Sequence, residues 1–168
     1  TYDYYVRSNC GVDGFSSWAG PFTFTTQCDA AVAPYLEDFE NGFTPITTNF
    51  PGIGDAFDRE NCYSATNSSY FWAIASGAFT GTAGTGPDPS ITTGNYFYAE
   101  GNGTDGAVAD LNTPLFDSNA LTVPSVSFDY HMVGANIGSL EIIVRVAGID
   151  NVVGTLTGAQ QGAVTDPY

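Results

Sequence analysis

The sequence contains no lysine, and its only basic residues are three arginines, against eighteen aspartates and glutamates. The formal net charge of -15 over 168 residues would repel a phosphate backbone or an anionic membrane surface. We therefore expect neither nucleic-acid binding nor attachment to anionic lipid. The same charge would attract divalent cations.

Long apolar runs are also missing. No stretch approaches the ~20 consecutive apolar residues that a helix needs to cross a bilayer, and the N-terminus has no basic region followed by an apolar segment. The sequence therefore predicts no membrane insertion. Three cysteines in a chain rich in Thr, Gly and Asn suit a disulfide-permissive compartment, so we expect a segment of a longer protein that is secreted or displayed at the cell surface.

Catalytic motifs are missing as well. The chain has a single histidine, His131, and neither a Gly-x-Ser-x-Gly nor a His-Glu-x-x-His motif, so a nucleophile elbow and a zinc site are not indicated. The run 37–40 (EDFE) departs from the Glu-x-Asp-x-x-Glu pattern of glucanase-type jelly rolls, because Glu37 and Asp38 would face opposite sides of a strand. We interpret His131 as structural, bonded to a neighbouring strand residue, and expect no enzymatic activity.

Aromatic and turn-forming residues are abundant: twelve Phe, ten Tyr, two Trp, twenty Gly and nine Pro. This composition is typical of short β-strands joined by tight turns. Short apolar segments punctuated by Gly, Pro and Asp follow one another between residues 70 and 117, and they predict an all-β antiparallel sandwich. We expect Trp18, Trp72 and most tyrosines in its core.

Two alternating runs predict a β-hairpin at the centre of this sandwich. Residues 126–132 and 140–146 both place apolar side chains at every second position, which is the period of a half-buried strand. With a loop at 134–138, antiparallel pairing would put Phe128 beside Val144 and create one wholly apolar face. A second layer should cover that face.

The acidic residues show no catalytic pattern, but their carboxylates could bind a hard cation. Glu40 and Asp88, the second of them in the turn-rich stretch 86–90, predict a calcium site. Solvated surface acids are the alternative, because the chain has no EF-hand spacing.

The first 26 residues contain two strand-like segments that resemble the last two strands of a fibronectin type III domain. The resemblance rests on Thr1-Tyr2, Val6-Arg7-Ser8, Ser17-Trp18, Gly20-Pro21 and the run FTFTT at 22–26. It implies that Tyr2 is the corner tyrosine whose hydroxyl bonds to backbone. It also leads us to expect that the preceding five strands of that domain lie outside this sequence.

Residues 35–147 resemble a MAM domain, the jelly-roll module named after meprin, A5 antigen and a receptor phosphatase. The shared motifs are DFE at 38–40, GP at 86–87, TTG at 92–94, ADLNTP at 109–114, FDYHM at 128–132 and GSL at 138–140. The two resemblances imply a concanavalin-like jelly roll preceded by the end of an immunoglobulin-like sandwich. The corresponding domains are 1–28, a linker at 29–34, and a MAM-like domain at 35–168 that is incomplete at its C-terminus.

The cysteines can be partly assigned. If the first two strands run up and then down, Cys10 and Cys28 lie at opposite ends, well beyond the ~7 Å that a disulfide spans, so they should not pair. Cys28 and Cys62 flank the start of the second unit as the first two cysteines of a MAM domain do, and the resemblance implies a disulfide between them. Cys10 is then free or paired outside this segment.

The resemblances imply a non-catalytic role in adhesion, with other modules of the parent chain or neighbouring chains as partners, as in large secreted bacterial surface proteins. A carbohydrate-binding accessory module of an extracellular hydrolase, with glycans as ligands, is the first alternative. A structural subunit of an extracellular fibre is the second. A complete MAM domain would recruit strands beyond Tyr168, so we expect an unpaired strand edge or its pairing by another chain.

Overall fold

The computed structural model describes residues 2–24, 28–46, 57, 59–66, 71–77, 87–88, 90–100, 106 and 108–168. These residues form several small sheets and one 3-10 turn (Gly11–Asp13), with no α-helix and no closed barrel among them. The all-β class is therefore confirmed at this level. The strands are β1 (Tyr2–Val6), β2 (Ala19–Phe24), β3 (Ala31–Val32), β4 (Arg59–Glu60), β5 (Tyr63–Thr66), β6 (Phe71–Ser76), β7 (Asn95–Glu100), β8 (Asp110–Asn112), β9 (Phe116–Asp117), β10 (Ser139–Val146) and β11 (Ile149–Thr157).

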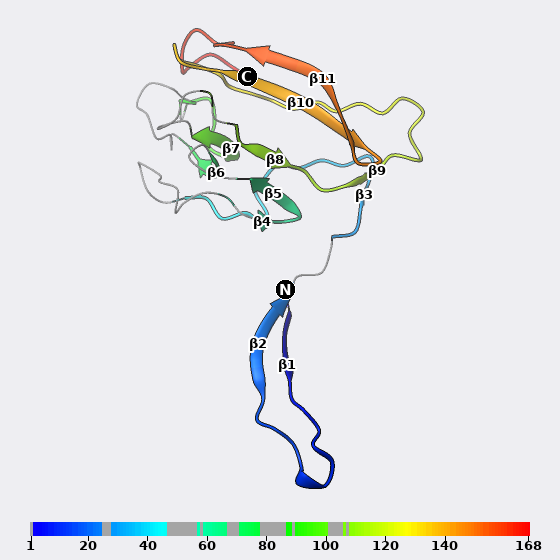
Figure 1. Ribbon diagram of the computed structural model, residues 1–168. Helices are drawn as coiled ribbons and strands as arrows, with labels where there is room; N and C mark the ends of the chain where they lie inside the picture. Colours follow the sequence, from blue (N-terminus) through cyan, green and yellow to red (C-terminus); the bar gives the residue numbers. More distant parts are fainter. Residues whose placement is uncertain are drawn as a thin grey trace.

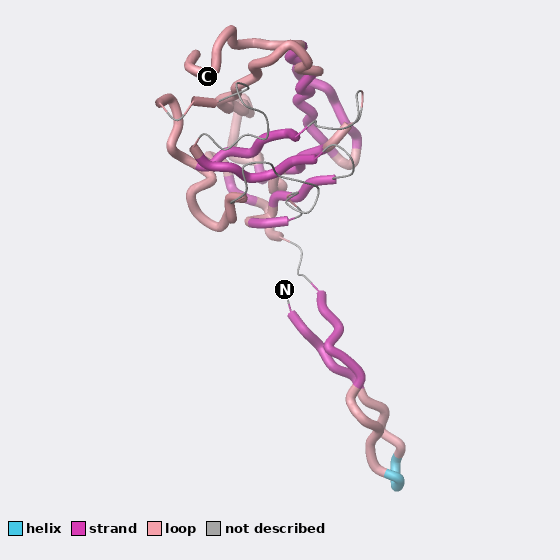
Figure 2. Tube along the Cα trace, turned by 90° about the vertical axis from the view of Figure 1, so that its left-hand side faces the viewer, coloured by secondary structure: helices cyan, strands magenta, loops and turns pink. Residues whose placement is uncertain are grey.

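Strands β1 and β2 form an antiparallel hairpin that projects away from the rest of the chain (Figures 1 and 2). Tyr2 pairs with Phe24 and Tyr4 with Phe22, so the four rings share one face of the ribbon. No hydrogen bond, ion pair or ring contact joins the described residues 2–24 to those from residue 28 onward. Among the described residues, only contacts within the hairpin hold it together.

The remaining strands build a body in which short sheets stack on one another. β4, β5 and β8 form one antiparallel sheet and β6 and β7 a second, while β10 and β11 lie across them on one side of the body (Figure 1). β3 pairs with β9 in parallel. Because β3 falls inside the stretch 29–34 that the sequence predicts as a linker, part of that stretch belongs to the body.

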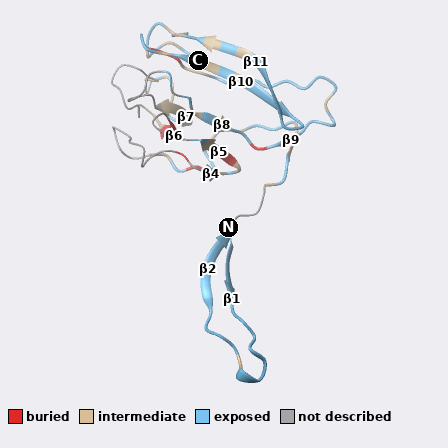
Figure 3. Ribbon diagram, viewed as in Figure 1, coloured by how far each residue is buried: buried red, intermediate tan, exposed pale blue. Residues whose placement is uncertain are grey.

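The core of the body is a cluster of mostly aromatic side chains, and buried residues lie in β5 and β6 but not in β10 or β11 (Figure 3). The rings meet edge to face, as between Phe57 and Phe97 with centroids 4.9 Å apart, which is a favoured geometry for aromatic pairs. Phe128 and Val144, which the alternating pattern places at the core, are both exposed, so that expectation is wrong. The cluster consists of Phe43, Phe57, Tyr63 and Ile74, with Phe39, Ala65, Phe97 and Leu111 packed against it.

The predicted hairpin between 126–132 and 140–146 is also wrong, because β10 pairs with β11 instead. The two strands are joined by Ala147 and Gly148, both with positive φ (51° and 80°), as a two-residue type I′ turn requires. A two-residue turn closes a shorter loop than the one expected at 134–138, so its conformational entropy cost is smaller. β11 therefore takes the place expected for 126–132.

The C-terminal segment connects the β10–β11 sheet to the rest of the body. The backbone N–H of Gln160 donates to Met132 O (2.8 Å), and Asp88 N–H donates to Val164 O (3.0 Å). The hydroxyl of Tyr168 donates to Ile91 O (2.9 Å). Residues 160–168 therefore hold the stretch around 132 and the loop before β7 in place.

Candidate functional site

A disulfide joins Cys28 to Cys62, with their Cα atoms 5.9 Å apart. The pairing predicted for these two cysteines is confirmed, and Cys10 is free and exposed near the tip of the β1–β2 hairpin. The bond connects two points 34 residues apart in the sequence, just before β3 and at the turn between β4 and β5. A disulfide indicates an oxidising compartment.

The turn that carries Cys62 consists of two residues only. Glu60 pairs with Tyr63 across the β4–β5 ladder, so Asn61 and Cys62 alone reverse the chain, and their φ angles are 46° and 68°. Asparagine tolerates this left-handed region, whereas the second position of such a turn normally holds glycine. One of the two cysteines of the disulfide, Cys62, therefore has a strained backbone conformation.

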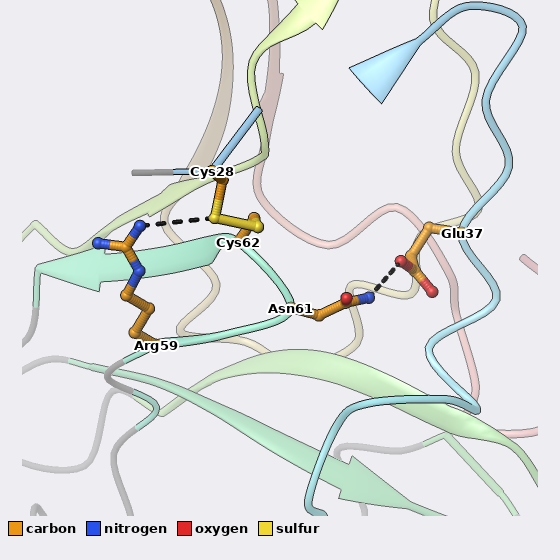
Figure 4. The surroundings of a disulfide bond; sticks show 5 residues. All are labelled: Cys28, Glu37, Arg59, Asn61 and Cys62. Atoms are coloured by element: carbon orange, nitrogen blue, oxygen red, sulfur yellow. Dashed lines mark hydrogen bonds between the residues drawn. A yellow bond between two sulfur atoms is a disulfide. The ribbon is translucent and has the colours of Figure 1, made fainter. Parts of the chain in front are cut away.

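Glu37 organises the polar groups beside this turn. Its carboxylate accepts a hydrogen bond from the Tyr35 hydroxyl (2.7 Å). A second comes from Asn61 Nδ2 (3.1 Å), as Figure 4 shows. It also accepts the backbone N–H of Phe39 (3.0 Å), whose φ is 62°. Burial, followed by electrostatic interaction with Tyr35 and then with Glu37, raises the pKa of the Tyr63 hydroxyl well above its usual value. Tyr63 therefore stays neutral at physiological pH.

Arg59, the first residue of β4, contacts the disulfide itself. Its Nη2 lies 3.7 Å from Cys28 Sγ, on the opposite side of the disulfide from Glu37 (Figure 4). Sequence reasoning missed this residue, since only the pairing of β4 with β5 brings Arg59 next to a sulfur 31 positions earlier. One of the three arginines of the chain therefore lies beside a sulfur of the disulfide.

The two residues predicted to bind calcium each bond to a nearby backbone. Glu40 Oε1 accepts the N–H of Asn95 (2.8 Å) at the start of β7, and Asp88 Oδ1 accepts the N–H of Ser90 (2.8 Å). Hydrogen bonds from Ser90 also hold the pKa of the Asp88 carboxyl below its usual value. Within the described part of the chain, no three His, Cys, Asp or Glu side chains form a group that could hold a metal ion. The calcium site stays a prediction.

His131 contacts Tyr168, with ring centroids 6.4 Å apart in an edge-on arrangement. Both ring nitrogens are buried, and neither has a hydrogen-bond partner among the residues that the structure describes. The expected bond to a neighbouring strand residue is therefore not made. The predicted pairing of 126–132 with 140–146 would have set Glu141 opposite His131, but Glu141 pairs with Thr155 of β11 instead.

The β1–β2 hairpin carries an exposed aromatic face. Tyr2, Tyr4, Phe22 and Phe24 remain 44–59 % exposed although their rings touch one another. Trp18 is 60 % exposed, and the Arg7 guanidinium lies over its ring. The expectation that Trp18 and most tyrosines are in the core is wrong for this hairpin, because its strands pair only with each other.

Two expectations about individual aromatics have different outcomes. The hydroxyl of Tyr2 makes no hydrogen bond to the described residues, so the corner-tyrosine role stays a prediction. Trp72 is partly buried, and its Nε1–H donates to Ala109 O (2.9 Å), as expected for a tryptophan at the edge of a core.

No family model matches the chain, and no solved structure matches it. None of the described segments forms a helix long and apolar enough to cross a bilayer.

Proposed function

We infer that this chain is a non-catalytic interaction segment of a larger secreted or cell-surface protein, and that it acts by association with other β-modules. The observation that carries this proposal is the aromatic face of the β1–β2 hairpin, formed by Tyr2, Tyr4, Phe22 and Phe24. Exposed apolar patches of this kind mark surfaces that bind other proteins. Aromatic side chains are also enriched among the residues that carry binding energy.

The hairpin has one aromatic face and one polar face, as a sheet of a β-sandwich has. On the face opposite the rings, Asp3 pairs with Thr23, whose hydroxyl donates to the Asp3 carboxylate (2.7 Å). An isolated two-stranded ribbon is marginally stable in water, and an apolar sheet packed against its aromatic face would supply the missing layer. Such a sheet is the partner that the geometry fits best.

Charge distribution favours association through the hairpin. Only Asp3 and Asp13 among the eighteen acidic residues lie before residue 28, and Arg7 offsets one of them. A partner that approaches the hairpin therefore meets little of the net charge of -15 carried by the whole chain.

The domain identities belong to the same proposal. The β1–β2 hairpin would be the end of a fibronectin type III-like domain, and the body a MAM-like jelly roll. Their sequence motifs and the Cys28–Cys62 disulfide support this assignment, and the disulfide also supports an extracellular location.

Carbohydrate binding is the second candidate, and the exposure of Trp18 favours it. Flat aromatic side chains can stack on sugar rings, and one face of this indole is already covered by Arg7, 4.5 Å from the ring centroid. Trp18 would therefore offer a single stacking surface beside a cation.

Adhesion of coated beads tests the proposal. Beads carrying the full chain should aggregate or attach to cells, and the double substitution Tyr4→Ser and Phe22→Ser should reduce attachment about tenfold or more, because it removes two anchors from the centre of the face. Val12→Ser is the matched control, since Val12 is fully exposed at the hairpin tip, away from this face. Equal attachment by the double variant and the wild type would refute the proposal. Selective glycan-array binding that Trp18→Ala abolishes would support the second candidate instead.

A further inference from the structure

We propose that the Cys28–Cys62 disulfide is a thiol-exchange site, at which a low-molecular-weight thiolate attacks Cys62 Sγ and Cys28 leaves as a thiolate beside Arg59. Three features of the structure support this: the cation at one sulfur, the strained turn at the other, and the partial exposure of both cysteines.

The position of Arg59 determines which cysteine leaves. In thiol–disulfide exchange, the sulfur that forms the more stable thiolate is the better leaving group. A neighbouring cation stabilises a thiolate, and Nη2 of Arg59 is 3.7 Å from Cys28 Sγ. Cys62 Sγ has no such contact with a described side chain (Figure 4). Departure of Cys28 is therefore favoured over departure of Cys62.

Attack at Cys62 follows from the departure of Cys28, because the incoming thiolate bonds to the sulfur that does not leave. Cys62 lies at the reversal between β4 and β5, where its φ of 68° is unfavourable for a residue with a side chain. Both cysteines are partly exposed rather than buried, so a small thiol can reach the bond. Once the bond to Cys28 breaks, the turn is no longer held by the cross-link.

A monothiol is the reductant in both steps of the exchange. The S–S bond between the two cysteines breaks, its electron pair leaves on Cys28 Sγ, and a new S–S bond joins Cys62 to the thiol. A second thiol then attacks this mixed disulfide at the small-molecule sulfur. Cys62 leaves as a thiolate, and the reductant departs as its own disulfide.

Exchange would loosen the attachment of the hairpin to the body. Cys28 is the first described residue after the β1–β2 hairpin, and the disulfide holds it against the β4–β5 turn. Without the disulfide, the nearest backbone bond in the described chain joins Ala31 N–H to Leu115 O (2.8 Å).

Reaction with reduced glutathione tests the proposal in the full chain carrying Cys10→Ser, which removes the only other thiol. Early time points are quenched with an alkylating agent, and peptide mass spectrometry locates the adducts. We expect glutathione on Cys62 and the alkyl group on Cys28. Glutathione found mainly on Cys28 would overturn the assignment.

The role of Arg59 is tested by its charge. Arg59→Gln should slow exchange roughly three- to tenfold, and Arg59→Lys should restore most of the rate, because a cation beside Cys28 is retained. The difference should shrink at 1 M salt and disappear in denaturant, where the local geometry is lost. Circular dichroism before the reaction verifies that each variant is folded. Equal rates for folded wild type and Arg59→Gln would overturn the proposal.

Discussion

At the scale of single residues, the β4–β5 turn depends on Asn61. Its φ of 46° lies in the left-handed region, and its side-chain amide donates a hydrogen bond to Glu37. The Glu37 carboxylate also accepts hydrogen bonds from the Tyr35 hydroxyl and the Phe39 backbone N–H. One asparagine therefore serves both the backbone geometry of the turn and the position of a carboxylate.

Asn61→Ala should lower the free energy of unfolding by about 1–2 kcal/mol, because alanine tolerates positive φ poorly and cannot donate to Glu37. Asn61→Gly is the matched control, since it loses the same hydrogen bond but accepts the backbone angle. We expect the glycine variant to be the more stable of the two. Urea unfolding measures both, and an alanine variant as stable as the wild type would contradict this account.

A second prediction at this scale concerns Asp150. Hydrogen bonds from Arg145, one of them 2.8 Å long, hold the pKa of the exposed Asp150 carboxyl below its ordinary value. Because the folded-state pKa is the lower one, the stabilisation is present above the unfolded pKa of about 3.9 and is lost as the pH falls through the folded value.

Carboxyl NMR titration should therefore give Asp150 a pKa below that of an unpaired aspartate. In Arg145→Gln the Asp150 pKa should return to its ordinary range, while the Asp88 pKa, which hydrogen bonds from Ser90 rather than an arginine hold below its usual value, stays unchanged. An identical Asp150 pKa in both proteins would show that the pair does not persist in solution.

At the scale of elements, the turn between β10 and β11 accounts for the observed pairing. Ala147 and Gly148 have φ angles of 51° and 80°, and the Arg145–Asp150 pair lies just beyond them. Asparagine followed by glycine is the preferred sequence for this turn. Alanine at the first position therefore makes this turn less stable than asparagine would.

Ala147→Asn should raise the free energy of unfolding by about 0.5–1 kcal/mol, since asparagine adopts positive φ at a lower cost. Gly148→Ala should have the opposite effect, because it places a side chain at a φ of 80°. Thermal melts at neutral pH measure both changes. If Ala147→Asn were destabilising, the β10–β11 turn would not have the geometry described.

The segment before β10 shows why an alternating pattern does not determine pairing. The carboxamide of Gln161 accepts the N–H of Met132 (2.8 Å) and donates to Tyr130 O (3.0 Å). These are the two bonds that a neighbouring parallel strand would make around His131. The side chain of Gln161 thus bonds the backbone groups of Tyr130 and Met132, which the predicted hairpin would have paired with β10.

At the scale of the whole molecule, the large negative charge should make the stability of the protein sensitive to divalent cations. We predict that millimolar calcium raises the melting temperature relative to chelator, through preferential binding to the folded state at Glu40 and Asp88. The double variant Glu40→Gln and Asp88→Asn should lose most of the calcium effect. Magnesium at the same ionic strength separates specific binding from general screening. Identical melts in calcium and chelator would rule out the site.

Composition and local patterns determined the class of this protein. The abundance of aromatics, Gly and Pro, together with period-two alternation, is enough to predict short β-strands, because these preferences act within a few residues. The cysteine positions, read through a family resemblance, predicted the Cys28–Cys62 bond.

Tertiary structure alone decided which strands pair, where the core lies and what surrounds each sulfur. Residues 126–132 carry the alternating apolar pattern expected of a partner for β10, yet β11, which lacks that pattern, pairs with β10 because the turn that joins the two is shorter. The core lies at Phe43, Phe57 and Tyr63 because segments far apart in sequence meet there: Tyr63 belongs to β5, and the backbone N–H of Phe57 donates to Trp72 O of β6. Arg59 reaches Cys28 for the same reason, since contacts between residues far apart in sequence depend on how the sheets pack and leave no trace in local patterns.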